Sequence, residues 1–233
     1  MPLVPKLRLH LADEAQTIDD PAGDQVPGAL RRMGVNVTLI DDEMLATGDL
    51  STFNTIVVGV RASEARPEFV ANNGRLRQYM EQGGTLIAVQ GAVRFPIEFG
   101  WARTVDVETP QGMNAQKPLV NAEISNPNSQ IFYGYEKTIF PVKFTQGAQV
   151  FRVGSADQAK IAAKYVGGDG AVLSGLGVGM DAVAGRAFVV DIPGANNGKG
   201  RVVLFANNPI YRWQNHGEFN MVFNAIMNWN DGK

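Results

Sequence analysis

The stretch that decides the fold is Gly83-Gly84-Thr85-Leu86-Ile87-Ala88-Val89-Gln90-Gly91-Ala92. Residues 85–90 form an apolar run of strand length, and the two glycines before it end a predicted helix. The chain then turns on small residues, because Ala88 and Ala92 stand two positions either side of Gln90. In a doubly wound sheet, a strand that ends in such a tight turn lifts one side chain above the sheet, as in a nucleophile elbow. The residue at this tip is Gln90, so the sequence predicts the turn without a nucleophile.

Strand and helix patterns alternate in the part of the chain that leads to this stretch. Residues 55–60 are almost continuously apolar, as expected of a strand that is buried on both faces of a parallel sheet. Further strands are predicted at 7–11 and 35–40, and helices at 24–33 and 67–82. This order of elements indicates one wound half of an α/β sheet.

The pattern changes after residue 93. Prolines, aromatic residues and short β-prone pieces predict a β-rich insertion at about 95–195, in which Gly167-Gly168-Asp169-Gly170 is a hairpin signal. Residues 218–229 predict a closing amphipathic helix. We therefore expect residues 1–233 to form a single α/β domain of three layers, with a doubly wound, mostly parallel sheet of the flavodoxin-like type. The predicted core is made of apolar strand residues, namely Leu39, Ile56, Val57, Val58, Leu86, Ile87, Val89, Val202, Leu204 and Phe205.

The composition excludes several classes of function. A hydrophobic share of 45% with 19% charged residues is typical of a globular protein and not of a disordered one. A net charge of −2 gives no electrostatic basis for binding nucleic acid or an anionic membrane. The chain has no cysteine, which excludes disulfides, thiolate metal sites and a cysteine nucleophile. Neither a signal peptide nor a membrane-spanning apolar run is recognised, and the localisation stays open.

Several stretches of the sequence resemble the class I glutamine amidotransferase-like superfamily. They are Val35-Asn36-Val37-Thr38-Leu39-Ile40 running into residues 48–53, Ile56-Val57-Val58-Gly59-Val60-Arg61-Ala62, and residues 76–87. The closer resemblance is to the amidotransferase-like module at the carboxyl end of zinc carboxypeptidase-like proteins, and related modules follow certain sugar N-deacetylases. The end of the chain carries this resemblance, in residues 198–205, Pro209, Tyr211-Arg212, His216-Gly217 and Phe223-Asn224-Ala225. It covers roughly residues 23–229, without the zinc-binding region of the metallopeptidase.

The resemblance implies a site, and the sequence departs from it at one position. Amidotransferases of this kind use a cysteine at the elbow and a later histidine and glutamate two residues apart. The cysteine position aligns with Gln90, which cannot attack a carbonyl carbon, so we do not expect glutaminase activity. The histidine–glutamate spacing is present as His216-Gly217-Glu218.

His216 and Glu218 are the first candidate catalytic pair. An imidazole can act as a general base near neutral pH, and a carboxylate can fix its tautomer. The alternative is a histidine at the start of a helix, with Glu218 placed favourably for the helix dipole. A single H-x-E spacing does not separate these interpretations.

A serine would have to replace the missing cysteine. Ser63 is the better candidate, because it follows a buried strand on the same edge of the sheet as the elbow. It could instead cap the helix that opens at Pro67. Arg61 is a candidate to bind a substrate carboxylate or offset an oxyanion, although Glu64 could simply pair with it.

The remaining candidates surround the elbow and the last connection of the chain. Backbone amides of Gln90 and Gly91 are candidates for an oxyanion hole. Tyr211 and Arg212 are candidates to line the same cleft, or else are ordinary packing residues. No cofactor is expected, because the chain lacks a glycine fingerprint for nucleotides. No metal is expected either, because His10 and His216 are its only imidazoles.

Two functions follow from these observations. The first is a cofactor-independent, slow and promiscuous hydrolase of carboxylic esters, lactones or small amides, with His216, Glu218 and Ser63 as its catalytic residues. The alternative is a catalytically inert module that binds a peptide, a glycan or a partner domain. For the hydrolase we expect a small-molecule ester or amide substrate, and a neighbouring domain of a larger parent protein is a possible partner. Self-association through an apolar face at Trp213, Phe219 and Trp229 is a further possibility.

Overall fold

The structure is a computed structural model that describes residues 7–10, 25–40, 42–59, 71, 73–145 and 147–230. Its centre is a run of five parallel strands: β1 (Leu7–His10), β2 (Val37–Ile40), β3 (Thr55–Val58), β4 (Thr85–Val89) and β14 (Gly200–Phe205). Their spatial order is β14-β4-β3-β1-β2, and every neighbouring pair is parallel. Ile56 pairs with Leu86, and Leu86 pairs with Val202, so the predicted apolar runs lie side by side.

Antiparallel strands extend the same sheet beyond β14. The first is β13 (Ala187–Gly194), followed by β10 (Ile161–Tyr165), β7 (Leu119–Ile124) and β11 (Val172–Ser174). Side branches are made by β5 (Val105–Glu108) with β9 (Val150–Val153), and by β8 (Ile139–Lys143) on β7. A separate small sheet pairs β6 (Asn114–Ala115) with β12 (Gly177–Val178). The β-rich character predicted for this region is therefore present, and it forms part of the main sheet.

The predicted hairpin at residues 167–170 is wrong. The strands on either side of it, β10 and β11, do not pair with each other but each pair with β7. Gly167 and Gly168 both have left-handed backbone angles, with φ of 73° and 74°. Such angles also occur in hairpin turns, but here the segment connects two strands that lie on either side of β7, so it does not close a hairpin.

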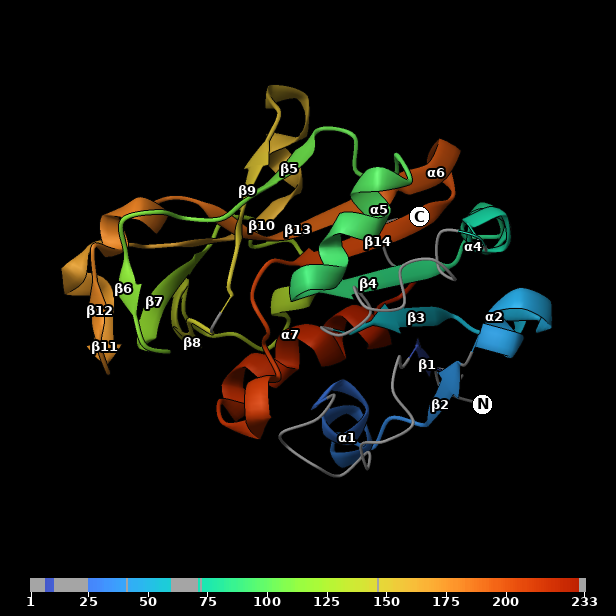
Figure 1. Cartoon of the computed structure of the whole chain (residues 1–233), viewed down its shortest axis with the longest axis horizontal. Coiled ribbons are helices and arrows are strands. Elements are labelled where there is room, and N and C mark those ends of the chain that lie inside the picture. Colours follow the sequence, from blue (N-terminus) through green and yellow to red (C-terminus); the bar gives the residue numbers. More distant parts are fainter. Residues whose placement is uncertain are drawn as a thin grey trace.

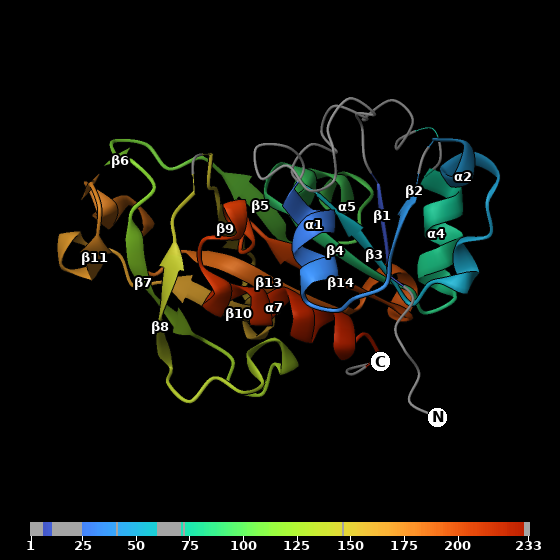
Figure 2. The ribbon, with the colours of Figure 1, turned by 90° about the horizontal axis from the view of Figure 1, so that it is seen from below.

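Helices cover both faces of the parallel strands. They are α1 (Gln25–Arg32), α2 (Asp42–Thr47), α4 (Asn73–Glu81), α5 (Arg94–Glu98), α6 (Ala195–Gly198) and α7 (His216–Met227). Figure 1 shows α1 and α7 on one side of the parallel strands and α5 on the other, and in Figure 2 α1 and α7 lie in front of the sheet. The prediction of an α/β fold with three layers around a mostly parallel central sheet is confirmed. None of the helices in the described ranges is long and apolar enough to cross a membrane.

The core follows the predicted strands. Nine of the ten predicted core residues are buried, and Leu39 is partly buried against them. Tyr79 fixes the start of β4, because its hydroxyl donates to Asn54 O at 2.8 Å and accepts from the amide of Thr85 at 3.0 Å. Arg201, which is 1% exposed, pairs with Asp191 through Nη2 at 2.7 Å and ties β14 to β13.

Candidate functional site

The elbow predicted after β4 is present in the backbone. Gln90 begins the short 3-10 turn η3 (Gln90–Val93) and has a φ of 53°. A left-handed backbone conformation costs roughly 1 to 2 kcal/mol for a residue that has a Cβ atom. The same strained turn presents the nucleophile in enzymes of this architecture. The chain therefore keeps the geometry of a nucleophile elbow with a glutamine at its tip.

The side chain of Gln90 fills the space at that tip. Gln90 is only 8% exposed. Its Nε2 atom lies so close to Gly147 that a Cβ added to this glycine would be 3.1 Å away. Gly147 itself has a φ of 75°, a left-handed conformation that favours glycine. The loop therefore approaches the elbow at a position that disfavours other residues. The side chain at the tip of the elbow is thus packed within the protein.

Glu218 is buried under the first turn of α7, with 1% of its surface exposed. Its Oε2 atom accepts hydrogen bonds from the backbone amide of Lys143 at 2.9 Å and from Nδ2 of Asn215 at 2.6 Å. Its Oε1 atom is buried without a hydrogen-bond partner among the described residues. Burial raises the pKa of this carboxyl well above its usual value. Glu218 therefore ties α7 to β8 through the hydrogen bond that it accepts from Lys143.

His216 lies on a different face of the same helix. Positions i and i+2 of a helix do not face each other, and no hydrogen bond joins His216 to Glu218 in the described part of the chain. The imidazole is exposed and packs at 5.0 Å, centroid to centroid, from the ring of Phe219. The predicted contact, in which Glu218 orients the imidazole, is not formed in this structure.

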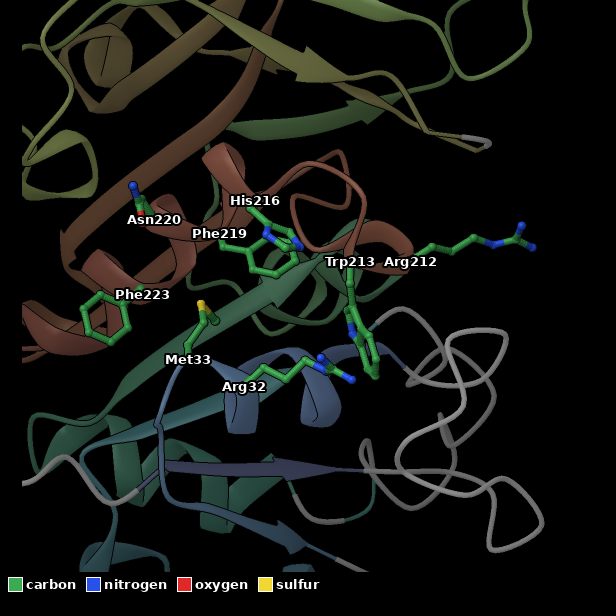
Figure 3. A pocket seen from close by; sticks show the side chains of 8 residues that line it. All are labelled: Arg32, Met33, Arg212, Trp213, His216, Phe219, Asn220 and Phe223. Carbon is green, nitrogen blue, oxygen red and sulfur yellow. The ribbon is translucent and has the colours of Figure 1, made fainter.

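A cavity of about 760 Å³ opens beside His216, between α1 and α7. Figure 3 shows the side chains around it, from the end of α1, from α7 and from the turn η8 (Tyr211–Trp213) before α7. Its lining consists of Arg32, Met33, Arg212, Trp213, His216, Phe219, Asn220 and Phe223. The four residues from α7 are spaced as i, i+3, i+4 and i+7, which places them on one helix face. No carboxylate is among these lining residues.

The turn before α7 is strained. Arg212 has a φ of 48° and Trp213 a φ of 55°, so two successive residues with side chains adopt the left-handed conformation. Each costs roughly 1 kcal/mol or more, and such residues cluster at binding and catalytic sites. The guanidinium of Arg32 stacks on the ring of Trp213, 4.1 Å from its centroid. The strained turn thus presents an aromatic ring to a cation on α1.

Two further cations lie over Tyr211. Lys117 Nζ and the guanidinium carbon of Arg212 are each 5.4 Å from the centroid of this ring. Lys117 also has a left-handed backbone, with a φ of 53°. We call this row of alternating cations and aromatic rings the cation–aromatic stripe, and its members are Lys117, Tyr211, Arg212, Trp213 and Arg32.

The structure groups only some of the predicted site residues. His216 and Arg212 line one cavity, and Tyr211 contacts Arg212 beside it. Gln90 lies at the sealed elbow, followed by the partly buried Gly91. The predictions for Arg61, Ser63 and Glu64 concern residues outside the described part of the chain, and an oxyanion hole at Gln90 and Gly91 stays a prediction.

Sequence reasoning missed the residues that α1 contributes to the cavity. Arg32 and Met33 end a predicted helix, where a basic side chain ordinarily answers the helix dipole. Lys117 lies in the β-rich region, far from the cavity in sequence. The signal that was available is on α7, where His216, Phe219, Asn220 and Phe223 repeat at helical spacing with a histidine and an amide on the face.

Comparisons with known proteins bear on the fold. No protein-family model matches the sequence, and no curated protein matches it. The structure is similar to a glutamine amidotransferase from Thermotoga maritima, with a TM-score of 0.57, 8% sequence identity, and coverage of 98% of this chain and 99% of that chain. It is similar to PurLQS from Thermotoga maritima, with a TM-score of 0.58, 14% identity and coverage of 97% and 99%.

A third similar structure belongs to a longer chain. Gan42B, a GH42 β-galactosidase from G. stearothermophilus, aligns with a TM-score of 0.54 and 10% identity. The alignment covers 98% of this chain but 30% of that one. Identities this low show the fold and not the activity. The chain has a class I glutamine amidotransferase-like fold.

Proposed function

We propose that this chain is a catalytically inert amidotransferase-like module that binds a partner through the cavity between α1 and α7. One observation carries the proposal, namely the burial of Gln90 at the tip of the elbow, with its amide against Gly147. An acyl-transfer enzyme needs an accessible nucleophile at a position where backbone amides can hold the oxyanion. Here an unreactive amide group fills that position.

The state of Glu218 supports the same conclusion. A carboxylate that assists an imidazole must be ionised and must accept a hydrogen bond from it. Glu218 instead accepts from Lys143 and Asn215, and its burial favours the neutral acid. The two residues with the H-x-E spacing therefore serve different purposes: one is a structural acid, and the other lines a cavity.

A role as a module agrees with where this kind of fold is found. In Gan42B the similar part is 30% of the chain, so this fold can form one section of a larger protein. We propose that the relation of this chain is closest to the module at the carboxyl end of zinc carboxypeptidase-like proteins, on the residues at 198–225 that carry the resemblance. The binding partner would then be a neighbouring domain or a protein that the parent protein recognises.

A slow hydrolase of esters, lactones or small amides is the second candidate, and one observation favours it. His216 is exposed and lines a cavity of about 760 Å³, which is large enough for a small ester. In this mechanism His216 takes a proton from water, or from Ser63. Without an orienting carboxylate, such a catalyst would exceed free imidazole only modestly.

Hydrolysis assays separate the two candidates. The intact chain is incubated with p-nitrophenyl acetate, with a lactone and with glutamine, and product formation is compared with that of the His216→Ala variant. The inert module predicts equal, background rates for both proteins, because surface substitutions leave the fold intact. A wild-type rate that falls at least about tenfold on His216→Ala would replace this proposal with the hydrolase.

A further inference from the structure

We propose that the cation–aromatic stripe and the cavity beside it bind an acidic peptide segment of a partner protein, which places one large apolar side chain against Met33 and Phe223. This inference rests on the proposed function for the role of the cavity. It adds the chemical class of the ligand. Three properties of the described residues carry it: their charge, the geometry of Arg32 and the apolar floor of the cavity.

Among the described residues, the charged side chains around the cavity are cationic. Arg32 and Arg212 both line it, and Figure 3 shows the guanidinium of Arg212 directed away from the other lining side chains. None of the described lining residues carries a carboxylate. Lys117 continues the positive charge along the stripe. The whole chain carries a net charge of −2, so this local excess of cations departs from its average. A partner with carboxylates complements such a surface.

Arg32 is presented in a way that suits a carboxylate. Its side chain is exposed, and its guanidinium stacks on Trp213 at 4.1 Å. Stacking occupies the face of the guanidinium and leaves its N–H edges directed outward, where they can bind a carboxylate with two hydrogen bonds. Within the described ranges, the Arg32 side chain forms no hydrogen bond or ion pair with another side chain, and its contact there is the stack on Trp213.

The other end of the cavity is apolar. Figure 3 shows Met33 reaching from the end of α1 toward α7, with Phe223 on one side and Phe219 on the other. Met33 and Phe223 are only partly buried, while Phe219 is 7% exposed and forms the floor. A thioether and aromatic rings adapt to many apolar shapes. This end therefore accepts a large apolar side chain next to the acidic group that Arg32 binds.

An acidic peptide fits better than the other ligands of an inert module. A glycan would need several amide or carboxylate groups to pair with its hydroxyls, and the described lining residues include one such group, the amide of Asn220. A nucleic acid would need a basic track along its backbone, which a chain of net charge −2 does not provide. A peptide satisfies both ends of the cavity at once, since it can carry a carboxylate and an apolar side chain on adjacent residues.

The test uses the full chain and three matched synthetic peptides, each acetylated and amidated at its ends. The first carries glutamates on both sides of one phenylalanine, the second has glutamines in place of the glutamates, and the third has alanine in place of the phenylalanine. Binding is followed by calorimetric titration. Arg32→Glu is compared with Arg31→Glu, which changes an exposed arginine in the same last turn of α1 that does not line the cavity.

We expect saturable binding of the first peptide, with binding at least about tenfold weaker for the other two peptides and for Arg32→Glu. Arg31→Glu should weaken binding by no more than about threefold, as expected of a charge outside the contact. Circular dichroism of both variants confirms that they are folded.

Three outcomes would each overturn the inference: an equal loss of affinity from the two substitutions, equal binding of the glutamine peptide, or no saturable binding to the wild-type chain. If hydrolysis that depends on His216 is absent while the peptide fails to bind, this inference fails and the inert module stands. If such hydrolysis is found, the proposed function itself fails.

Discussion

The elbow and the cavity are two regions of one molecule that differ in which features of a catalytic site they show. The elbow has the backbone of a catalytic turn, with Gln90 held at a φ of 53°, but its tip is 92% covered by the protein, since Gln90 is 8% exposed. The cavity has exposed polar side chains, His216 and Arg32 among them, but no nucleophile or orienting carboxylate among its lining residues. Neither region therefore offers a nucleophile among its described residues.

The difference shows which features of a site depend on the fold. The turn at Gln90 is set by the sheet, because β4 is paired in register on both sides, with β3 and β14, up to the point where the turn begins. Its conformation therefore does not require a nucleophile at the tip, although it costs about 1 kcal/mol. Reactivity depends on single side chains and on what packs over them.

The largest expected effect is a difference in thiol accessibility between the two regions. The chain has no cysteine, so Gln90→Cys and His216→Cys each introduce a single thiol. A thiol at the buried position reacts only after local opening, whereas one at the exposed position reacts directly. We expect a maleimide to label the His216→Cys protein at least about a hundredfold faster than the Gln90→Cys protein.

Labelling in concentrated urea supplies the control, because both thiols should then react at about the same rate. Similar rates for the two folded proteins would show that the elbow is open to small molecules. That result would remove the main support for the inert module and restore the elbow as a candidate site.

The second effect concerns the buried carboxyl group of Glu218. Burial raises the pKa of Glu218 in the folded protein above its unfolded value. Below the unfolded pKa both states are protonated. As pH rises above it, the unfolded state ionises first, and folding loses up to about 1.4 kcal/mol per pH unit until the folded pKa is reached. Glu218→Gln cannot ionise, and its amide oxygen can still accept from Lys143.

We therefore expect the free energy of unfolding of Glu218→Gln, relative to wild type, to increase as pH rises from about 4.5 toward neutrality. Urea unfolding of both proteins across that range measures the difference. A difference that is independent of pH, or one that falls as pH rises, would mean that Glu218 is ionised in the fold. Glu218 would then be available to assist a base, as the hydrolase requires.

Much of the fold follows from the sequence, because the pattern of apolar residues along a strand indicates which of its faces are buried. The apolar runs at 55–60 and 85–90 lie next to each other as β3 and β4, in the parallel register that their continuous apolar character predicts. The hairpin predicted at residues 167–170 failed for a physical reason. Glycine-rich loops permit many turns, and pairing with β7 on both sides is a long-range interaction that a local signal does not contain.

The site was less predictable than the fold, since it depends on which helix face an exposed residue occupies. The spacing of His216 and Glu218 suggested a pair, yet in α7 two positions apart means opposite environments, one exposed and one buried. The stack of Arg32 on Trp213 joins residues that are remote in sequence and depends on a left-handed turn at Arg212 and Trp213. Residue propensities do not predict a left-handed backbone at two successive residues when neither of them is glycine.

The smallest expected effect tests the strain that the cavity shares with the elbow. Gln90 is buried, so any substitution there changes packing as well as backbone strain, but Arg212 is exposed and has a φ of 48°. Arg212→Gly and Arg212→Ala both remove the guanidinium, so the difference between them reports the backbone. Alanine must pay for the left-handed conformation, and glycine adopts it freely. We expect Arg212→Gly to be more stable than Arg212→Ala by about 1 kcal/mol in urea unfolding.

The control is the same pair of substitutions at Arg31, which is exposed within α1. There the alanine variant should be the more stable one, because glycine costs about 1 kcal/mol relative to alanine in a helix. If the alanine variant is at least as stable as the glycine variant at position 212, the left-handed backbone at the rim of the cavity costs no free energy of folding. The similar backbone angles of Arg212 and Gln90 would then not indicate strain at the cavity.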